Sequence, residues 1–498
     1  MEAWKDVIHD NELETRRAFN RTLTAGGEIS FDTVIAGGGV AGLFCAWTLK
    51  QTFPSQSVCV LDRRTHIGGR IRLSKLADGT ILENGPWRVH ESHKHVIRLI
   101  KDLGLTLEAN ASSHDEPTED SGENDLDGLS TFDNDTYRMG AETARVNDVM
   151  SGYEGINDAD SKANVYHGQR HKSGTYYYIK EGFMEIITRL EKKCHELGVD
   201  IRSNHMVIDV TRIRDHYKVD ILENKTHDNK SLPTIVFGSR FVTAIPPHLV
   251  DWKGCIVHLR PLLDSVKSLS LHHIYAQEKN SATITGIHRT PGALSQVIGG
   301  DTKARYFQIS YSAGRIADYW QRLHLNHPEK FEKKIKAEFH SLYPKIELSG
   351  DIHAFYWRHA VHMWKPIFGQ VNTLAHIVDA AIEPHPVQLP QFYFIGEACS
   401  GNQGWIEGAL ETTLEAVSRM QSPKAIQYGP PSHNDYLIYD GRYIDMRKFK
   451  YVHPGSQALI EEHLNNETRD VTDLFNIITH PDYAYAMLMS LQTGWKRE

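Results

Sequence analysis

Three glycines near the start of the chain have the spacing of a phosphate-binding turn. Gly37, Gly39 and Gly42 follow an apolar run, and a helical pattern begins at Val40 and Ala41. In such a turn the first glycine permits the tight bend, the second lets backbone approach a pyrophosphate, and the third lets helix pack on strand. The free amides at the helix N-terminus then face the phosphates. The sequence therefore predicts a dinucleotide site.

A carboxylate at the end of the next strand supports this interpretation. Asp62, with Arg63 beside it, closes the apolar run 58–61, twenty residues after Gly42. A carboxylate placed there can accept hydrogen bonds from ribose hydroxyls. Glycine turns also serve purely structural ends, but the order of strand, turn, helix, strand and carboxylate favours dinucleotide binding.

The composition of the 498 residues is that of an ordinary globular protein, with 40% hydrophobic and 24% charged residues. A net charge of -8, without a Lys/Arg run, argues against a nucleic-acid partner. Five scattered cysteines form no disulfide or zinc pattern, which favours a reducing compartment. We find no secretory signal and no segment apolar enough to span a membrane, so we expect a cytoplasmic protein.

The residue pattern divides the chain into four parts. We expect a charged helical arm over 1–30 and an α/β core over 31–421. Within the core, the acidic stretch 109–135 predicts a surface loop, disordered or used for docking. The Pro- and Gly-containing stretch 422–434 is typical of a linker, which leaves 435–498 as a small separate module.

Four further motifs carry a resemblance to a known family. They are His66-Ile-Gly-Gly-Arg70, Glu83-Asn-Gly-Pro-Trp-Arg88, Phe392-Tyr-Phe-Ile-Gly-Glu397 and Gly404-Trp-Ile-Glu-Gly-Ala409. Over roughly residues 30–420 the chain resembles the flavin-containing amine oxidase superfamily. The resemblance implies a Rossmann-like α/β FAD-binding domain, assembled from about 31–108, 200–260 and 385–421, with an interleaved α+β substrate domain. FAD should be non-covalent, because segment 362–369 lacks the cysteine that some monoamine oxidases link to flavin.

The same resemblance implies roles for individual cofactor contacts. Gly69 and Arg70 would pass along the phosphates and the flavin edge, and Glu397 would hold the ribityl–pyrophosphate region. The helix after Trp405 would point its N-terminus at the flavin N1/C2 carbonyl, where reduced flavin carries negative charge. The backbone of Val207 would contact adenine. The other expected cofactor contacts are Gly85, Pro86, Trp87, Gly396, Gly404 and Ile406.

The substrate side centres on Arg88. Its motif looks like the place where L-amino-acid oxidases keep the arginine that binds the substrate α-carboxylate, which a planar guanidinium fits with two prongs. A structural or surface ion pair is the alternative. Tyr311 resembles the family tyrosine that assists the same carboxylate, although it could equally be a core residue. Trp405 would form one wall of an aromatic slot over the flavin.

His273 departs from the family pattern, because many relatives have a lysine near flavin N5 at this place. A histidine there could titrate near neutrality, or it could simply be packed or exposed. The departure leaves the handling of oxygen and of imine hydrolysis open.

The expected reaction is oxidative deamination of an L-amino acid to a 2-oxo acid and ammonia. One alternative is an amine or polyamine oxidase of the same fold, whose substrates would not need Arg88. The other is a non-catalytic flavin and haem redox relay.

The C-terminal module contains a possible haem site. Residues 435–498, with His453 in a His-Pro-Gly motif and His480 downstream, resemble a cytochrome b5-like domain. In that family the two histidines are the axial ligands of haem b, which then transfers electrons without binding oxygen. Ser456 replaces the usual second glycine, so a haem-free accessory domain is the alternative. Either oxygen or the haem would reoxidise the flavin.

Overall fold

The computed structural model of the protein describes residues 29–109, 128–171, 174–223, 232–255, 259, 262–279, 284, 286–299, 306–366, 378, 381–384, 389–421, 435–447, 449–451, 453, 457–466, 468–478, 484, 488 and 491–496. The predicted helical arm, apart from its last two residues, and the predicted linker 422–434 lie outside the described residues.

The larger sheet is of the predicted α/β type, with strand order β8-β2-β1-β11-β10-β9 and β17 against β11. Its strands are β1 (Ser30–Ala36), β2 (Val58–Leu61), β8 (Asp200–Arg202), β9 (His205–Ile213), β10 (His216–Glu223), β11 (Leu232–Thr243) and β17 (Phe392–Phe394). β1 lies between β2 and β11 and is parallel to both. Its alternate residues enter two separate cores, Ile35 one and Val34 and Ala36 the other, which explains its continuous apolar run.

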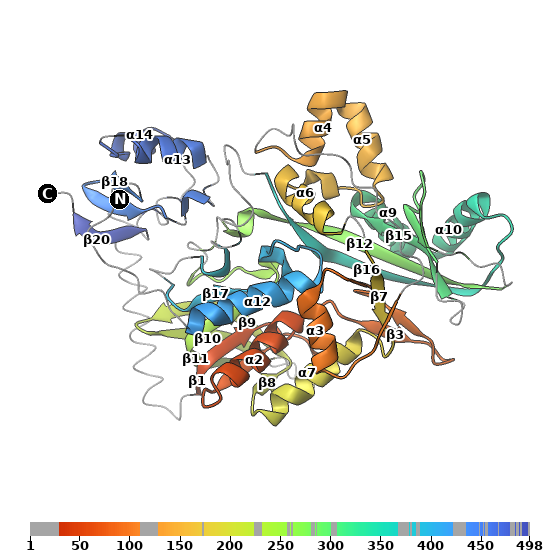
Figure 1. The fold of residues 1–498 in the computed structure, drawn as a ribbon, viewed down its shortest axis with the longest axis horizontal. Coiled ribbons are helices and arrows are strands. Elements are labelled where there is room, and N and C mark those ends of the chain that lie inside the picture. Colours follow the sequence, from red (N-terminus) through yellow and green to blue (C-terminus); the bar gives the residue numbers. More distant parts are fainter. Residues whose placement is uncertain are drawn as a thin grey trace.

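Four helices pack against this sheet and form one core with it (Figure 1). They are α2 (Val40–Thr52), α3 (Lys94–Asp102), α7 (Met184–Glu196) and α12 (Ile406–Gln421). The glycine turn lies between β1 and α2, as the sequence predicts.

The second sheet is antiparallel, with order β13-β14-β15-β12-β16. Its strands are β12 (Val266–Glu278), β13 (Ile287–Arg289), β14 (Gln296–Ile298), β15 (Tyr306–Ala313) and β16 (Leu348–Trp364). Helices α9 (Gly314–Asn326) and α10 (Pro328–Leu342) pack on one face around the buried Trp320 and Phe339. On β12 and β15, His273 and Tyr311 are cross-strand partners that line the cavity described below.

Shorter elements lie along the chain between the strands and helices described above. They are β3 (Leu73–Lys75), β4 (Ile81–Glu83), β5 (Val89–His90), β6 (Leu107–Ala109), β7 (Tyr176–Ile179), α4 (Thr131–Met139), α5 (Ala141–Met150), α6 (Ser161–Arg170), η1 (Ile156–Asp158), η2 (Pro247–Leu249) and η3 (Glu397–Cys399). The predicted acidic loop 109–135 is too long at its C-terminal end, because α4 begins at Thr131. The side chains of Ser130 and Asp133 form a capping box there, and this fixes the helix start. Residues 110–127 of that loop lie outside the described part.

The C-terminal residues form a separate three-stranded sheet, β18-β19-β20, drawn apart from the larger sheets in Figure 1. Its elements are β18 (Tyr436–Tyr439), β19 (Arg442–Asp445), η4 (Phe449–Tyr451), α13 (Gln457–Leu464), α14 (Thr472–Ile477) and β20 (Gln492–Lys496). Asp440 and Gly441 both have positive φ, +48° and +70°, so they make the tight hairpin that an Asp-Gly pair predicts.

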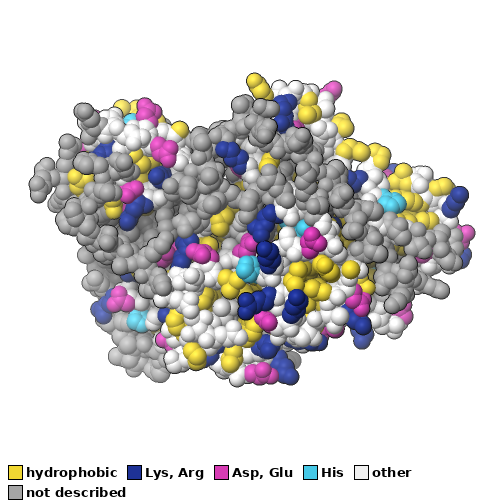
Figure 2. Space-filling model, viewed as in Figure 1, with side chains coloured by type: hydrophobic (Ala, Val, Ile, Leu, Met, Phe, Trp, Pro, Cys, Tyr) yellow, Lys and Arg dark blue, Asp and Glu magenta, His cyan; other side chains and the backbone are white. Residues whose placement is uncertain are grey.

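Charged side chains of both signs are interspersed on the face drawn in Figure 2. Among the described residues, none of the helices has the length and apolar character needed to cross a membrane.

Candidate active site

A cavity of about 1010 Å³ lies where the glycine turn, strands β12, β15 and β16, and the start of α12 meet. The sequence-predicted residues that line it are Gly37, Gly39, Val40, Ala41, Asp62, Arg63, Gly69, Arg70, Gly85, Pro86, Trp87, Arg88, Val207, His273, Tyr311, Gly396, Glu397, Gly404, Trp405 and Ile406. Of the predicted glycines, Gly42 is not among the lining residues. The structure thus brings segments more than 300 residues apart to one site.

The glycine turn leaves its backbone open to a ligand. Gly37 has φ +108°, which favours glycine, and a Cβ on Gly39 would meet nothing nearer than the Cα of Gly69, at 3.8 Å. A Cβ on Gly42 would lie 1.9 Å from the carbonyl oxygen of Gly37, so this glycine serves the packing of α2 on β1.

Asp62 holds this turn in place. Its Oδ2 accepts the backbone N–H of Gly38 at 2.7 Å, and its Oδ1 accepts that of Arg64 at 2.8 Å. The carboxylate therefore stiffens the turn in addition to any contact with ribose. An open glycine backbone, a helix N-terminus and a strand-end carboxylate beside a large cavity fit a dinucleotide such as FAD.

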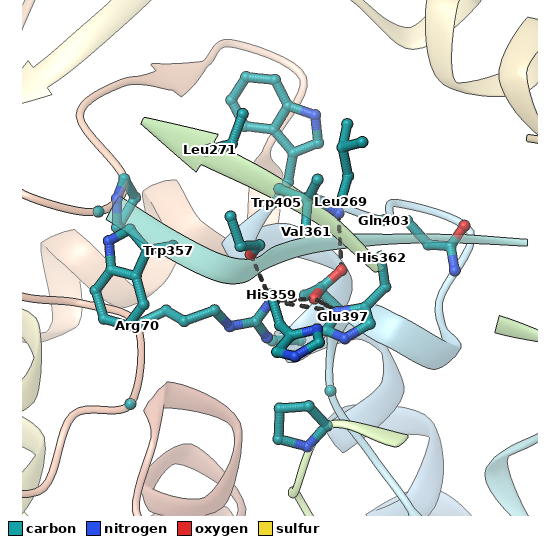
Figure 3. A pocket seen from close by; sticks show the side chains of 18 of the residues that line it. Arg70, Leu269, Leu271, Trp357, His359, Val361, His362, Glu397, Gln403 and Trp405 are labelled. Atoms are coloured by element: carbon teal, nitrogen blue, oxygen red, sulfur yellow. Dashed lines mark hydrogen bonds and ion pairs between the residues drawn. The ribbon is translucent and has the colours of Figure 1, made fainter. Parts of the chain in front are cut away.

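Glu397 is the centre of a charged group in the cavity wall (Figure 3). It forms an ion pair with Arg70, its Oε1 lies 2.6 Å from Nδ1 of His362, and its Oε2 accepts the N–H of Gly404 at 2.8 Å. Burial alone would raise the pKa of Glu397, but the Arg70 and His362 charges outweigh it and hold the pKa well below its usual range. Glu397 therefore ties the β2–β3 connection, β16 and the loop before α12 together.

Three imidazoles stack beside this group. The ring of His248 lies 3.6 Å from that of His359 and 5.6 Å from that of His362, centroid to centroid, and both pairs are nearly parallel. Burial, with the neighbouring imidazoles and Arg70, lowers the pKa of His248 to about 3, so this ring is neutral at physiological pH.

Arg88 lies buried in an aromatic part of the wall, with 8% of its surface exposed. Its guanidinium carbon is 4.3 Å from the ring centroid of Tyr176, 4.9 Å from that of Trp87 and 5.5 Å from that of Trp405. Its Nη2 donates to the hydroxyl of Tyr153 at 3.4 Å. The surface ion pair considered from the sequence is wrong, because this side chain is inside the cavity wall.

His273 and Tyr311 make an edge-to-face pair, with centroids 4.8 Å apart and ring planes at 86°. Burial lowers the pKa of His273 to about 3. The possibility that this histidine titrates near neutrality is therefore wrong, and so is the possibility that it is exposed. It is a neutral packed ring in the cavity wall.

The predicted haem ligands are not brought together by the described residues. His453 lies outside the cavity, half-buried, with its ring 5.4 Å from that of Phe449. His480 lies outside the described residues, so its pairing with His453 stays a prediction.

Sequence reasoning missed two groups of histidines. One is the stack of His248, His359 and His362, and the other surrounds Trp405 and is discussed below. Among 29 histidines, no local motif distinguishes these positions. Only the folded contacts between distant segments reveal them.

Comparisons with known proteins give matches over part of the chain. The family model of flavin containing amine oxidoreductases matches residues 40–127. A putrescine oxidase of Kocuria rosea is 38% identical over 85 residues, and an uncharacterised protein of Acanthamoeba polyphaga mimivirus is 40% identical over 79 residues. Each match covers 16 to 17% of both chains, so the chain spans about a sixth of the length of these relatives.

Solved structures extend the likeness to the whole fold. A putrescine oxidase bound to putrescine superposes with a TM-score of 0.58 at 16% identity, and the match covers 79% of this chain and all of that one. A protein of an Exiguobacterium species described as a protoporphyrinogen oxidase superposes with a TM-score of 0.56 at 13% identity. The family model thus matches one part of the chain, and the solved structures share its fold.

Proposed function

We propose that the protein oxidises the C–N bond of an L-amino acid with FAD, and that Arg88 binds the substrate carboxylate. The observation that carries the proposal is the buried guanidinium in the aromatic wall of the cavity. When bound, FAD accepts a hydride from the substrate α-carbon. Water then converts the resulting imine to a 2-oxo acid and ammonia.

The charge of Arg88 supports an amino acid over a diamine. A buried cation attracts a carboxylate strongly, because little water screens the interaction, and a guanidinium can bind both carboxylate oxygens. A diamine would bring a second positive charge to the same wall and be repelled. The likeness to putrescine oxidases therefore extends to the fold and the cofactor, and we place the substrate with the amino acids.

The residues around Arg88 give the substrate its orientation. Tyr176, Trp87 and Trp405 fix the guanidinium by cation–π contacts, and Tyr311 and His273 form the adjoining wall. With His273 neutral, this wall supplies no additional positive charge. The protein's main task is then to hold the α-carbon in place and to exclude water.

Substitution of Arg88 tests this proposal. Anaerobic flavin reduction would be measured with an L-amino acid and with the amine that its decarboxylation gives, for example L-phenylalanine and phenethylamine. In Arg88→Met we expect kcat/KM for the amino acid to fall by about 100-fold or more, as for loss of a buried charge pair worth about 3 kcal/mol. The kcat/KM for the amine should fall little, because the amine has no carboxylate for Arg88 to bind.

Arg98→Met is the matched control, because Arg98 is a surface residue of α3 whose side chain is 83% exposed. It should retain both activities. An equal loss of both substrates in Arg88→Met would show that Arg88 has a structural role, and the carboxylate proposal would fail.

We also propose that the C-terminal module accepts electrons through haem b held by His453 and His480. The support is the sequence resemblance, together with a compact apolar core formed around Leu437, Ile444 and Ile460. A haem-free accessory module is the alternative, and the absorbance spectrum described in the Discussion separates the two.

A further inference from the structure

Three buried histidines surround Trp405. His90, His93 and His171 are 1%, 2% and 4% exposed. The His171 ring stacks on the Trp405 indole, with centroids 4.8 Å apart and planes at 19°, and the His93 ring meets the indole edge at 4.8 Å. Trp405 immediately precedes α12, so two imidazoles hold this side chain where the helix begins at the cavity.

The hydrogen bonds fix where the protons of this group lie. The backbone N–H of His90 donates to Nδ1 of His93 at 3.1 Å, so the ring proton of His93 is on Nε2. That Nε2 lies 2.8 Å from Nε2 of His171. Two nitrogens at this distance share one proton, so His93 donates and His171 accepts.

A second proton cannot enter this dyad of His93 and His171 without breaking a hydrogen bond. A proton on Nε2 of His171 would set two N–H groups against each other. A proton on Nδ1 of His93 would face the backbone N–H of His90. Both of these hydrogen bonds therefore require two neutral rings.

The charged groups on the α3 and α6 sides are engaged elsewhere. Glu407 accepts the backbone N–H of His95 at 3.0 Å, and Glu411 accepts Nη2 of Arg170, also at 3.0 Å. These hydrogen bonds of the two carboxylates run to α3 and α6.

The groups near the dyad on the β5 and β7 side include charges of both signs. Arg88 is a buried cation next to the Trp405 ring, and His90 and Tyr176 contact each other at a centroid distance of 4.8 Å. Glu91 accepts the N–H of Thr175 at 2.9 Å. Arg88 would oppose a positive charge on the dyad and Glu91 would favour one, so the dyad's own hydrogen bonds decide its response to acid.

We propose that His93 and His171 are positioning residues that hold the Trp405 ring in the cavity wall only while both imidazoles are neutral. Acid breaks the dyad, releases Trp405 and weakens substrate binding against that wall. The inference rests on the proposed function only in taking Trp405 as a wall that faces substrate. The optical state of Trp405 depends on no substrate.

The first test is the near-ultraviolet circular dichroism of the holoenzyme, titrated from about pH 8 to about pH 5, the range in which histidines gain protons. Subtracting the spectrum of Trp405→Phe isolates one of nine tryptophans. The wild-type Trp405 signal should disappear on acidification. In His93→Gln it should persist, because an amide N–H replaces the Nε2 donor and does not titrate.

His195→Gln is the control, since His195 is a surface histidine of α7, and it should titrate like the wild type. His171→Gln is a second variant, whose amide oxygen can accept from His93. It should also move the loss of signal to lower pH. An unchanged titration in both dyad variants, or no titration in the wild type, overturns the proposal.

The kinetic test uses the amino acid that reduces the flavin. As the pH falls, the wild-type kcat/KM should decrease because KM rises. In His93→Gln this decrease should occur about one pH unit or more lower than in the wild type. The same acid-side decrease of kcat/KM in His93→Gln and in the wild type would contradict the proposal. If no amino acid reduces the flavin, the proposed function fails, while the circular dichroism still decides this inference.

Discussion

Glu397 is a buried carboxylate whose partners come from three distant segments. Arg70, His362 and the backbone of Gly404 all bind it. Removing one charge from such a group leaves the opposite charges buried without a counter-charge. The resulting loss of folding free energy is larger than the net free energy that the whole ion pair contributes. The residue therefore serves the architecture of the site as much as the cofactor contact that the family resemblance implies.

We predict that Glu397→Gln lowers the free energy of unfolding by about 3 kcal/mol at neutral pH, because it leaves His362 and Arg70 without a carboxylate. Urea unfolding of the FAD-free protein measures this without interference from the cofactor. Glu185→Gln, in an exposed pair with Arg189 on α7, is the control and should cost less than about 1 kcal/mol.

The same carboxylate gives the stability a pH dependence of known sign. Its folded-state pKa is depressed below the ordinary value of 4.5, so its contribution is present above that value and is lost as the pH falls toward the folded-state pKa. The gap between wild type and Glu397→Gln should therefore narrow below about pH 4.5. A gap that is constant down to acid pH would contradict the ion-pair account.

At the scale of elements, α2 packs tightly against the glycine turn that follows β1. The backbone of Gly42 approaches the carbonyl of Gly37 so closely that a methyl group would have to displace the helix. This contact sets the N-terminus of α2, at which we expect the phosphates, so we expect packing and cofactor binding to be coupled there.

We predict that Gly42→Ala destabilises the fold by about 1 to 3 kcal/mol through overpacking, and that it weakens FAD binding at the displaced helix end. Thermal unfolding and FAD titration followed by flavin fluorescence measure the two effects. Gly168→Ala, in α6 where a Cβ would meet nothing within 4 Å, should instead leave the stability unchanged or raise it by up to about 1 kcal/mol. Equal behaviour of the two variants would refute this account of Gly42.

Short sequence motifs predicted the larger sheet and the part of the cavity that the glycine turn lines. Gly37, Gly39 and Asp62 lie within one β-α-β unit, where spacing along the chain fixes position in space. The start of α4 was misplaced because the acidic stretch before it hid the capping box of Ser130 and Asp133.

The substrate side could not be derived from spacing in the same way. His93 and His171 are 78 residues apart, and Arg70 and Glu397 are 327 apart, so only the folded sheets bring them together. Family resemblance named Arg88, Tyr311, His273 and Trp405, but burial decided that His273 is a neutral packed ring. The histidines around Trp405 matched no motif at all.

The whole molecule combines the larger sheet with its glycine turn, a second sheet that lines the same cavity, and a small C-terminal sheet. The structural likeness to putrescine oxidase covers 79% of this chain and supplies the fold, while the sequence matches cover about a sixth of it. The substrate and the electron acceptor therefore have to be argued from this chain's own residues. Arg88 argues for a carboxylate on the substrate, and His453 is the described half of the expected haem pair.

One measurement tests the central claim most directly: the anaerobic absorbance spectrum of the purified protein, before and after addition of L-amino acids, and separately of putrescine. The account predicts that flavin bands bleach with an amino acid and not with putrescine, and that ferrous-haem bands then rise if the C-terminal module carries haem. Flavin bleaching without a haem signal would leave that module as an accessory domain. Bleaching by putrescine alone, or by neither substrate, would contradict amino-acid oxidation.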